Sequence, residues 1–574
     1  MFQNEKIIEI KTCKHCQSSF SITDKDLEFY EKISPKFRDK KYFIPIPSLC
    51  PDCRQQRRLS FRNERKLYKR KCDATGKLII SIYSPDKPYK VYEQSYWWSD
   101  SWNALDYGKD FDFSKSFFGQ FGELLNKVPK QSLIGANNVN SEYCNLTADN
   151  KNCYLIYESS NNEDCIFGYW LQKCNNCVDV SFSHECNECY YIQDSFNCYN
   201  LFFSNNCEDC RDSFYLENCY GCKNCFASVN LNNKEYFILN KKYSKEKYFE
   251  ILQKDKENIK KEFEKLFKNS IKKYGNIKLA ENSYGDYMKG VKNCVNCFHA
   301  YDAEDCKYAE HIWRNAKNCM DVSTAGRDAE FVYESINCGI GDYNFNFCVQ
   351  CWTGSSLNYC MFSSNIHNCF GCVGLVNKSY CILNKQYSKE EYEILVPKII
   401  EHMISTGEWG EFFPSTISPF GYNETVAQEY FPISRDKALP YLYQDGKQIF
   451  NWSDYEPPFP KVEKIITVEM YSNTSLLEDA NKVPDDILNR AIECEITKKP
   501  FRIIKQELEF YRKHNLPILK RHPDQRHLDR MNLRNPRKLF DRKCDKCGKD
   551  IKTTYSPERH EIVYCEECYN KEIY

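Results

Sequence analysis

The chain has 574 residues, a length typical of roughly three to five domains. Its 80 basic and 80 acidic residues leave no formal net charge, which excludes a global field that attracts nucleic acid or a membrane. Aromatic residues make up 15% of the chain, which is typical of an ordered protein. The sequence shows neither the apolar core of a signal peptide nor an apolar run long enough to cross a membrane, so we expect a cytoplasmic protein without a membrane partner. In that reducing compartment its 34 cysteines are expected to be metal ligands or buried thiols more often than disulfides.

Residues 1–100 are predicted to form an N-terminal zinc-ribbon module. Its ligands are two Cys-x-x-Cys pairs, because such a pair places two sulfurs about 2.3 Å from one tetrahedral Zn²⁺. A disulfide framework is the alternative, but nothing in the sequence points to export. The predicted metal ligands are Cys13, Cys16, Cys50 and Cys53.

A run of basic residues follows Cys53. Its arginines recur at the spacing of one helical face, and arginine suits bidentate contact with phosphate. The sequence therefore predicts a nucleic-acid-binding helix, and a solvated or internally paired charge run is the alternative. The predicted contacts are Arg54, Arg58, Arg62, Arg65 and Lys69.

Three tryptophans, Trp97, Trp98 and Trp102, lie at the end of this module and the start of a connector at 101–136. Such a cluster indicates either a stacking platform for bases or sugars, or an apolar plug between domains.

Residues 137–278 are predicted to form the first half of a cysteine-rich repeat region that ends in a helix. From Cys144 to Cys225 successive cysteines are three, nine or twelve positions apart, and a step of twenty-one positions recurs. We expect a repeat of this longer length to form one coil of a β-solenoid, with Asn at the tight corners. The cysteines are then buried thiols, ligands of zinc or an iron–sulfur cluster, or disulfide rungs, in that order.

Residues 279–408 are predicted to form a second, duplicated half, also with a terminal helix. The segment Asn233–Glu246 matches Asn377–Glu390 position by position. In each half a serine, Ser244 or Ser388, is a plausible cap for a helix that packs on the repeats or binds a partner. A connector rich in Pro and aromatic residues follows at 409–484.

Residues 485–574 are predicted to form a second zinc-ribbon module. Cys494 in this module aligns with Cys13, and His522 aligns with Cys50, but each copy has kept only one four-cysteine site. In the first copy the four ligand positions of the lost site are occupied by Cys72, Thr75, Glu93 and Tyr96. In the second copy those of the lost site are occupied by Cys494, Thr497, His522 and Gln525. The predicted second metal site is Cys544, Cys547, Cys565 and Cys568, and the predicted nucleic-acid contacts are Arg526, Arg530, Arg534 and Arg537.

Several motifs resemble a bacterial family of cysteine-rich repeat proteins with terminal zinc-ribbon modules, for which no activity is established. They are Cys50–Arg58, Phe61–Arg65, Tyr96–Trp98, Gly410–Pro414 and Cys544–Gly548. The resemblance spans most of the chain and its motifs are specific, but it implies no particular activity. A coenzyme A transferase label carried by some members has no support in these residues.

The predicted fold is mainly β: a Cys/Asn-rich β-solenoid, similar to a parallel β-helix, in two duplicated halves between two zinc-ribbon or treble-clef-like α+β modules. Two Zn²⁺ per chain are the expected cofactors. No phosphate-binding loop, dinucleotide fingerprint, HExxH or GxSxG motif is present, which favours a non-catalytic role.

The expected function is binding or scaffolding, with nucleic acid or a ribonucleoprotein as the ligand. Three alternatives remain. They are a protein-assembly scaffold, a β-helix enzyme that cleaves glycans with carboxylates on one face, and a metal-handling or redox protein that uses the repeat cysteines. The candidate carboxylates are Glu163, Asp164, Asp179, Asp194, Asp209, Asp212 and Asp305.

Overall fold

A computed structural model describes residues 5–438, 449–458, 462, 464–472, 474 and 477–573. The chain forms two compact units. The first contains Met1–Leu133, Lys273–Tyr455 and Pro536–Arg559, and the second contains Ile134–Lys272, Glu456–Asn535 and His560–Tyr574. Each unit therefore combines module segments with one repeat half, whereas the sequence predicts six consecutive segments. Within the described residues, no helix has both the length and the apolar character needed to cross a membrane.

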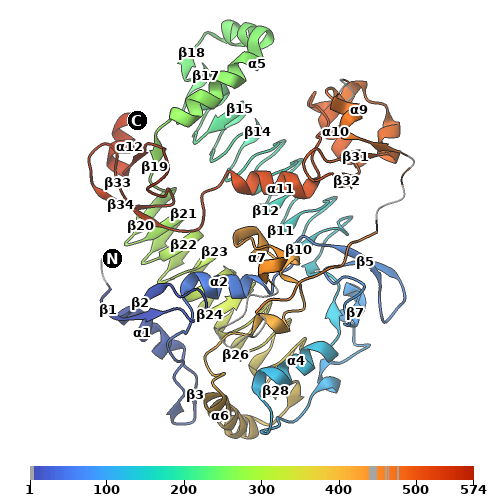
Figure 1. The fold of residues 1–574 in the computed structure, drawn as a ribbon, viewed down its shortest axis with the longest axis vertical. Coiled ribbons are helices and arrows are strands. Elements are labelled where there is room, and N and C mark those ends of the chain that lie inside the picture. Colours follow the sequence, from blue (N-terminus) through green and yellow to red (C-terminus); the bar gives the residue numbers. More distant parts are fainter. Residues whose placement is uncertain are drawn as a thin grey trace. The chain divides into compact units, whose positions relative to one another are not determined.

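The first repeat array, residues 135–242, consists of short parallel strands (Figure 1). Tyr157 pairs with Tyr169 and Tyr169 with Ser181, so that the register advances by twelve residues at each strand. An antiparallel hairpin, β17 with β18, ends the array. The strands are β9 (Gly135–Ala136), β10 (Asn145–Ala148), β11 (Tyr157–Ser160), β12 (Tyr169–Gln172), β13 (Ser181–His184), β14 (Tyr199–Phe202), β15 (Arg211–Glu217), β16 (Lys223–Val229), β17 (Glu235–Ile238) and β18 (Lys241–Lys242).

A three-residue pattern underlies this register. From Asn161 to Asn197 every third residue has a φ near +50°, and many of these residues are Asn or Asp, which tolerate that conformation best. From Cys174 to Cys198 every third residue is buried, with at most 2% of its surface exposed. The longer coil expected from the cysteine spacings is therefore wrong: the repeat is twelve residues, and the recurring step of twenty-one is one such repeat plus nine residues.

Cysteine suits the inward positions because the space inside the array is narrow and flanked by main-chain carbonyls. Cys177 illustrates the common contact: its Sγ lies 3.2 Å from the carbonyl oxygen of Asn175 and 3.5 Å from that of Cys186. A thiol is small, apolar and a weak donor, so that it fills this position and still satisfies a carbonyl. All 34 cysteines of the chain are free of disulfide bonds.

The second array, residues 277–386, repeats this architecture less regularly. Tyr343 pairs with Ser355 twelve residues on, but Lys317 pairs with Glu330 thirteen residues on. Ala303 also pairs with Ala316 thirteen residues on, and the additional residue of that step lies at Arg314–Asn315, where both residues have positive φ. The strands are β20 (Ile277–Glu281), β21 (Tyr284–Lys292), β22 (Val295–Glu304), β23 (Glu310–Ala325), β24 (Glu330–Ile336), β25 (Tyr343–Asn346), β26 (Ser355–Asn358), β27 (His367–Phe370), β28 (Cys381–Ile382) and β29 (Lys385–Gln386).

A helix follows each array, as the sequence predicts. Helix α5 (Lys245–Asn269) begins after Ser244, whose hydroxyl accepts from the amide of Lys247 at 3.3 Å. Helix α6 (Lys389–Thr406) begins in the same way after Ser388. The apolar side of α6 contributes Val396, Ile399 and other residues to the core of the first unit.

The first unit contains the N-terminal module, which packs on the second array. Aromatic residues from both meet there: the rings of Tyr30 and Tyr333 lie 5.6 Å apart. Its helices and strands before the arrays are β1 (Ile7–Thr12), β2 (Ser19–Thr23), α1 (Asp24–Ile33), β3 (Lys36–Phe37), β4 (Lys40–Lys41), α2 (Pro51–Leu59), β5 (Tyr68–Lys71), β6 (Leu78–Ser81), β7 (Val91–Tyr92), α3 (Gln94–Trp97), α4 (Phe117–Lys127) and β8 (Lys130–Gln131). The later elements of this unit are α7 (Ala427–Tyr430), α8 (Arg435–Ala438), β33 (Phe540–Lys543) and β34 (Asp550–Thr553).

The second unit contains the first array and most of the C-terminal module. Ile166, Val178, Tyr190 and Phe202 follow one another at twelve-residue steps and pack against residues of this module such as Tyr511. The module elements in this unit are β30 (Ile465–Ile466), α9 (Val468–Ser472), β31 (Ala491–Glu493), β32 (Pro500–Phe501), α10 (Lys505–Lys513), α11 (Pro523–Asn532), β35 (Val563–Tyr564) and α12 (Glu566–Ile573).

The three tryptophans favour the packing interpretation. Trp97 is 4% exposed, in a cluster with Cys72 and Tyr92. The indole nitrogen of Trp102 donates to the carbonyl of Trp97 at 2.7 Å. Trp98 is 46% exposed, but the burial of Trp97 excludes a stacking platform that uses all three rings.

Candidate metal centres and arginine networks

The structure brings together both predicted cysteine quartets. The sulfurs of Cys13, Cys16, Cys50 and Cys53 lie within 4.8 Å of one another, and those of Cys544, Cys547, Cys565 and Cys568 do so as well. Within the described residues, these are the only groups of three or more candidate ligand atoms at that spacing.

The local fold explains how the first quartet forms. Cys13 follows β1, and its amide donates to the carbonyl of Ser18 at 2.9 Å, which closes a tight knuckle. Cys50 is the N-cap of α2, and Cys53 lies in the first turn of that helix. The amide of Lys14 donates to Ser48 at 3.1 Å and thereby ties the two knuckles together.

The donor set fits a tetrahedral metal ion with thiolate ligands. The sulfurs of Cys16 and Cys50 are 3.6 Å apart, close to the separation of about 3.8 Å expected for a tetrahedron with bonds of about 2.3 Å. Cys13, Cys50 and Cys53 are buried, and Cys16 is exposed. In the second quartet Cys544 and Cys565 are buried and Cys547 is exposed.

The two decayed sites keep the backbone of a knuckle without a full set of four ligands. Residues four positions after Cys13, Cys72, Cys494 and Cys544 all have positive φ, as Gln17 with 61° and Gly76 with 73° show. In the decayed sites the lone thiol accepts a main-chain hydrogen bond instead. The amide of Glu93 donates to Cys72 at 3.3 Å, and that of Thr497 donates to Cys494 at 3.5 Å.

The predicted basic helical face does not exist in the form expected. Helix α2 ends at Leu59, so that Arg62 and Arg65 lie beyond it and Lys69 lies on β5. Similarly, α11 ends at Asn532, before Arg534 and Arg537.

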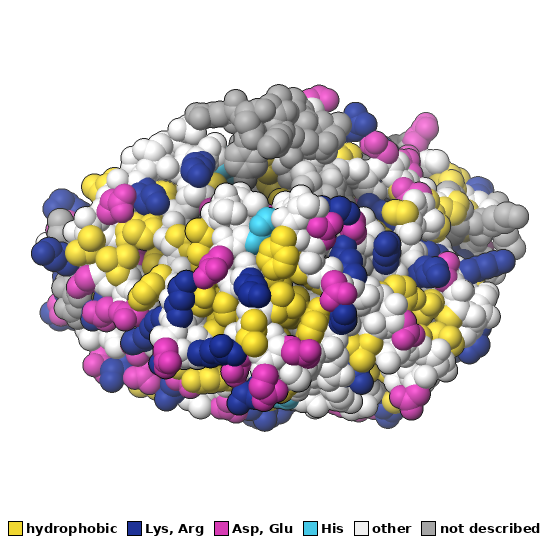
Figure 2. Space-filling model, turned by 90° about the horizontal axis from the view of Figure 1, so that it is seen from below, with side chains coloured by type: hydrophobic (Ala, Val, Ile, Leu, Met, Phe, Trp, Pro, Cys, Tyr) yellow, Lys and Arg dark blue, Asp and Glu magenta, His cyan; other side chains and the backbone are white. Residues whose placement is uncertain are grey.

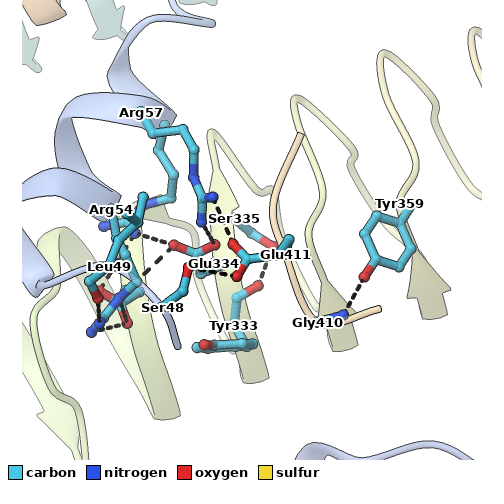
Figure 3. A network of polar contacts seen from close by, with 12 residues as sticks. Ser48, Leu49, Arg54, Arg57, Tyr333, Glu334, Ser335, Tyr359, Gly410 and Glu411 are labelled. Atoms are coloured by element: carbon cyan, nitrogen blue, oxygen red, sulfur yellow. Dashed lines mark hydrogen bonds and ion pairs between the residues drawn. The ribbon is translucent and has the colours of Figure 1, made fainter. Parts of the chain in front are cut away.

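In the first unit, buried carboxylates of the second array bind these arginines. Arg54 is 2% exposed and donates to Asp321 through Nε at 2.9 Å. Arg58 is 1% exposed and donates to Glu334 at 3.1 Å. Arg57 bridges Glu334 and Glu411 at 2.8 and 3.0 Å (Figure 3). Burial raises the pKa of Glu334, and the charges of Arg57 and Arg58 oppose that shift.

Two further arginines in this unit also have partners. Arg62 contacts Glu64 and donates to the hydroxyl of Thr324 at 3.1 Å. Arg65 lies 3.9 Å from Glu429.

The second unit has the equivalent network. Arg526 and Arg530 are each 1% exposed and donate to the two oxygens of Asp179 at 2.7 and 2.6 Å. Arg534 lies 3.3 Å from Asp194. Burial raises the pKa of Glu507, which also accepts from Arg526.

Arg537 belongs to the first unit, where it pairs with Glu310. Burial opposes the ionisation of Glu310, yet the charge of Arg537 holds the pKa of this carboxyl below its ordinary value.

These contacts correct the placement expected for the nucleic-acid residues. Eight of the nine are arginines that bind the chain's own carboxylates, and Lys69 alone is exposed. On the face shown in Figure 2, Lys and Arg side chains are interspersed with Asp and Glu side chains.

Sequence reasoning missed Asp179 and Asp321 as partners, although a signal was present. Asn176–Ser181 and Asn318–Ser323 read Asn-Cys-x-Asp-Val-Ser in both arrays. Both aspartates have positive φ, 56° and 55°, and both accept from two arginines.

The acidic residues suggested for a glycan-cleaving face have other roles. Asp179 and Asp194 bind arginines, and Glu163 pairs with Lys151 at 2.6 Å. Four others accept amide hydrogens from asparagines twelve residues earlier, so that they form ladders along an array. They are Asp164, Asp209, Asp212 and Asp305, which accept from Asn152, Asn197, Asn200 and Asn293.

Comparison with known proteins adds little to this geometry. No family model matches the chain, and no curated relative matches it. A solved structure of a suggested acetyltransferase from Desulfovibrio desulfuricans G20 matches with 11% identity over 42% of this chain and a TM-score of 0.11. The chain spans 63% of the length of that protein, and the likeness is too low to carry an argument.

Proposed function

We propose that the protein is a non-catalytic, zinc-stabilised scaffold that binds protein partners. The observation that carries this proposal is the burial of the arginines that follow both Cys50 and His522. Arg54 and Arg58 pair with Asp321 and Glu334 inside the first unit, so these side chains join module to array instead of facing a polyanion. The nucleic-acid function that the sequence favours thus loses its main support, and the protein-assembly scaffold takes its place.

Zinc is the metal proposed for both quartets. Four cysteine sulfurs are a soft donor set, and a closed four-thiolate site is typical of structural Zn²⁺. Such a site contributes to folding, because the ligands come together only in the folded chain. In the first module the metal would hold Cys50 and Cys53 at the start of α2, and thereby set the position of Arg54 and Arg57.

Each array is proposed to be a β-solenoid with coils of twelve residues. The parallel register at twelve-residue steps, the positive φ at every third residue and the buried column of every third side chain support this assignment. Solenoids present long regular faces, which other proteins use as binding surfaces.

The free cysteines agree with a reducing cytoplasm, which is the proposed compartment. No specific observation favours the glycan-cleaving or the metal-handling alternative. The candidate carboxylates pair with arginines, asparagines or, for Glu163, a lysine, and the described quartets lie outside the arrays.

The test is purification of the full chain from its native cells after chemical crosslinking, with and without nuclease, beside a variant with Cys50→Ser and Cys53→Ser. The proposal expects a defined protein partner in fixed ratio that survives nuclease and is lost from the variant. Partners that disappear with nuclease, together with salt-dependent binding of RNA or DNA by the purified protein, would instead establish nucleic-acid binding.

A further inference from the structure

The two modules contain the same β-hairpin, but within the described part of the chain a third strand covers only one of them. In the C-terminal module β31 pairs with β32, and Ile492 is opposite Phe501. In the N-terminal module β1 pairs with β2, and Lys11 is opposite Phe20. Lys11 aligns with Ile492 and Phe20 with Phe501 in the duplicated sequence, so the register of the two hairpins is the same.

In the C-terminal copy the chain covers the outer edge of the hairpin itself. Strand β30 lies parallel to β31, with Ile465 opposite Ala491 and Ile466 opposite Ile492. The amide of Ala491 donates outward to the carbonyl of Lys464 at 3.0 Å. Ala491 and Ile492 are 0% and 1% exposed as a result.

In the N-terminal copy the equivalent edge has no such cover. Among the residues that the structure describes, β1 pairs with β2 alone. Ile10, which corresponds to Ala491, is 67% exposed, and Ile8 is 50% exposed. An exposed edge strand of this kind is a template for an added strand.

Hydrogen-bond alternation shows which groups of β1 face outward. The amide of Cys13 donates inward to the carbonyl of Ser18. By the alternation of an antiparallel pair, the main-chain N–H and C=O of Lys11 also point toward β2, whereas those of Ile10 and Thr12 point away from it. The outward amide of Ile10 thus corresponds to the amide that Ala491 donates to Lys464.

We infer that the outer edge of β1 is a docking site for an extended, β-branched segment of a partner protein, which joins β1 and β2 as a third, parallel strand. The occupant follows from the chain itself: the strand seated on the equivalent edge is β30, Ile465–Ile466, which lies in the extended segment Lys-Ile-Ile-Thr at 464–467. Main-chain bonds supply the affinity and branched aliphatic side chains cover the exposed isoleucines, as in other cases of strand addition. The inference rests on the proposed scaffold function and names one of its contact surfaces.

The test uses a fluorescent peptide with the sequence of residues 464–470, titrated with the zinc-loaded full chain. The chain's own β30 occupies the C-terminal edge, so the peptide finds the free edge at β1. Saturable binding is expected, and a peptide with Ile466→Pro should bind at least about ten-fold more weakly, since proline cannot donate to the ladder.

Two variants of the protein locate the site. Ile10→Pro removes an outward amide that β2 does not use, and Ile10→Lys places a charge on the edge. Each should weaken peptide binding at least about ten-fold. Leu78→Lys is the matched control: Leu78 is 70% exposed on another two-stranded hairpin, so this variant should bind the peptide normally.

The outcomes separate the docking site from the scaffold function. Absence of saturable binding, or equal binding by the Ile10 variants, overturns the docking site even where crosslinked partners support a scaffold. A dimer in solution that Ile10→Lys converts to monomer also overturns it, because a second copy of the chain then occupies the edge. If the crosslinked protein retains no partner after nuclease treatment while the peptide still binds to β1, the scaffold function is overturned instead.

Discussion

The contact of Arg54 with Asp321 in the first unit is equivalent to the contact of Arg526 with Asp179 in the second: in both, the arginine donates to the aspartate. The two arginines align in the duplicated modules, and the two aspartates align in the duplicated arrays, within the shared motif Asn-Cys-x-Asp-Val-Ser. One ancestral contact between a module and an array has therefore been retained in both copies, with the N-terminal module on the second array and helix α11 on the first.

Removal of either aspartate should destabilise its unit strongly. Asp321→Asn leaves Arg54 and Arg58 buried with one charged partner fewer, which costs about 3–5 kcal/mol when a buried pair is broken. Asp305→Asn is the matched control, because Asp305 also has a positive φ but is exposed and accepts only from an asparagine. Thermal and urea unfolding of the two variants measures the difference, and equal losses would contradict the role assigned to Asp321.

The asparagines at left-handed positions should tolerate glycine better than valine. Asn197 has a φ of 49° and donates to Asp209 through its side chain. Both Asn197→Gly and Asn197→Val lose that bond, but only valine meets the steric cost of this conformation, about 1–3 kcal/mol. Denaturant melts should therefore rank the native chain and Asn197→Gly above Asn197→Val. The reverse order would show that the twelve-residue repeat does not depend on these corners.

Asp342 should make the first unit less stable as the pH rises. This side chain is 0% exposed, and burial raises the pKa of its carboxyl to about 7. The folded chain holds the proton of this carboxyl more tightly than the unfolded chain does. The protonated carboxyl therefore adds to the free energy of unfolding in full below about pH 4, and this contribution is lost as the pH rises to about 7. The loss amounts to at most about 4 kcal/mol.

Asp342→Asn removes this titration and should flatten the dependence of the melting temperature on pH between about 4 and 7. The asparagine oxygen can still accept from the amide of Gly339, as Asp342 does. Asp328→Asn, at an exposed position of the same array, should leave the dependence unchanged. A native-like slope in Asp342→Asn would assign the pH effect to another group.

The thiols of the arrays should be unreactive until the chain unfolds. Cys177, Cys186 and Cys189 are all 0% exposed, and a thiol reagent attacks the exposed thiolate. In denaturant all 34 thiols should react, whereas chelation of the native protein should expose at most the eight cysteines of the two quartets. Rapid reaction of further thiols in the native protein would show that the arrays are open.

The sequence predicted the metal quartets more accurately than the repeats. Ligand spacing is local, so that the quartets at Cys13 and Cys544 follow directly from pairs of Cys-x-x-Cys. The period of the arrays was harder to find because cysteine shares the inward positions with other small or aliphatic residues such as Val180, Ser183 and Ile192. The cysteine spacings alone therefore indicated a coil longer than the twelve-residue repeat.

The burial of the arginines could not be predicted from the module sequence. The partners of Arg54 and Arg58 lie 267 and 276 residues away, and only the packing of module on array brings them together. The neutral net charge showed that enough acidic residues exist to pair with the basic ones, but not which of them do so.

The metal content of the anaerobically purified full chain tests the two proposed zinc sites directly. We predict about two zinc ions and no iron per chain, with one zinc ion lost in Cys13→Ser/Cys16→Ser and one in Cys544→Ser/Cys547→Ser. Markedly more zinc, or iron in a fixed ratio, would contradict this prediction, because the array cysteines would then bind metal and the protein would handle metals or electrons.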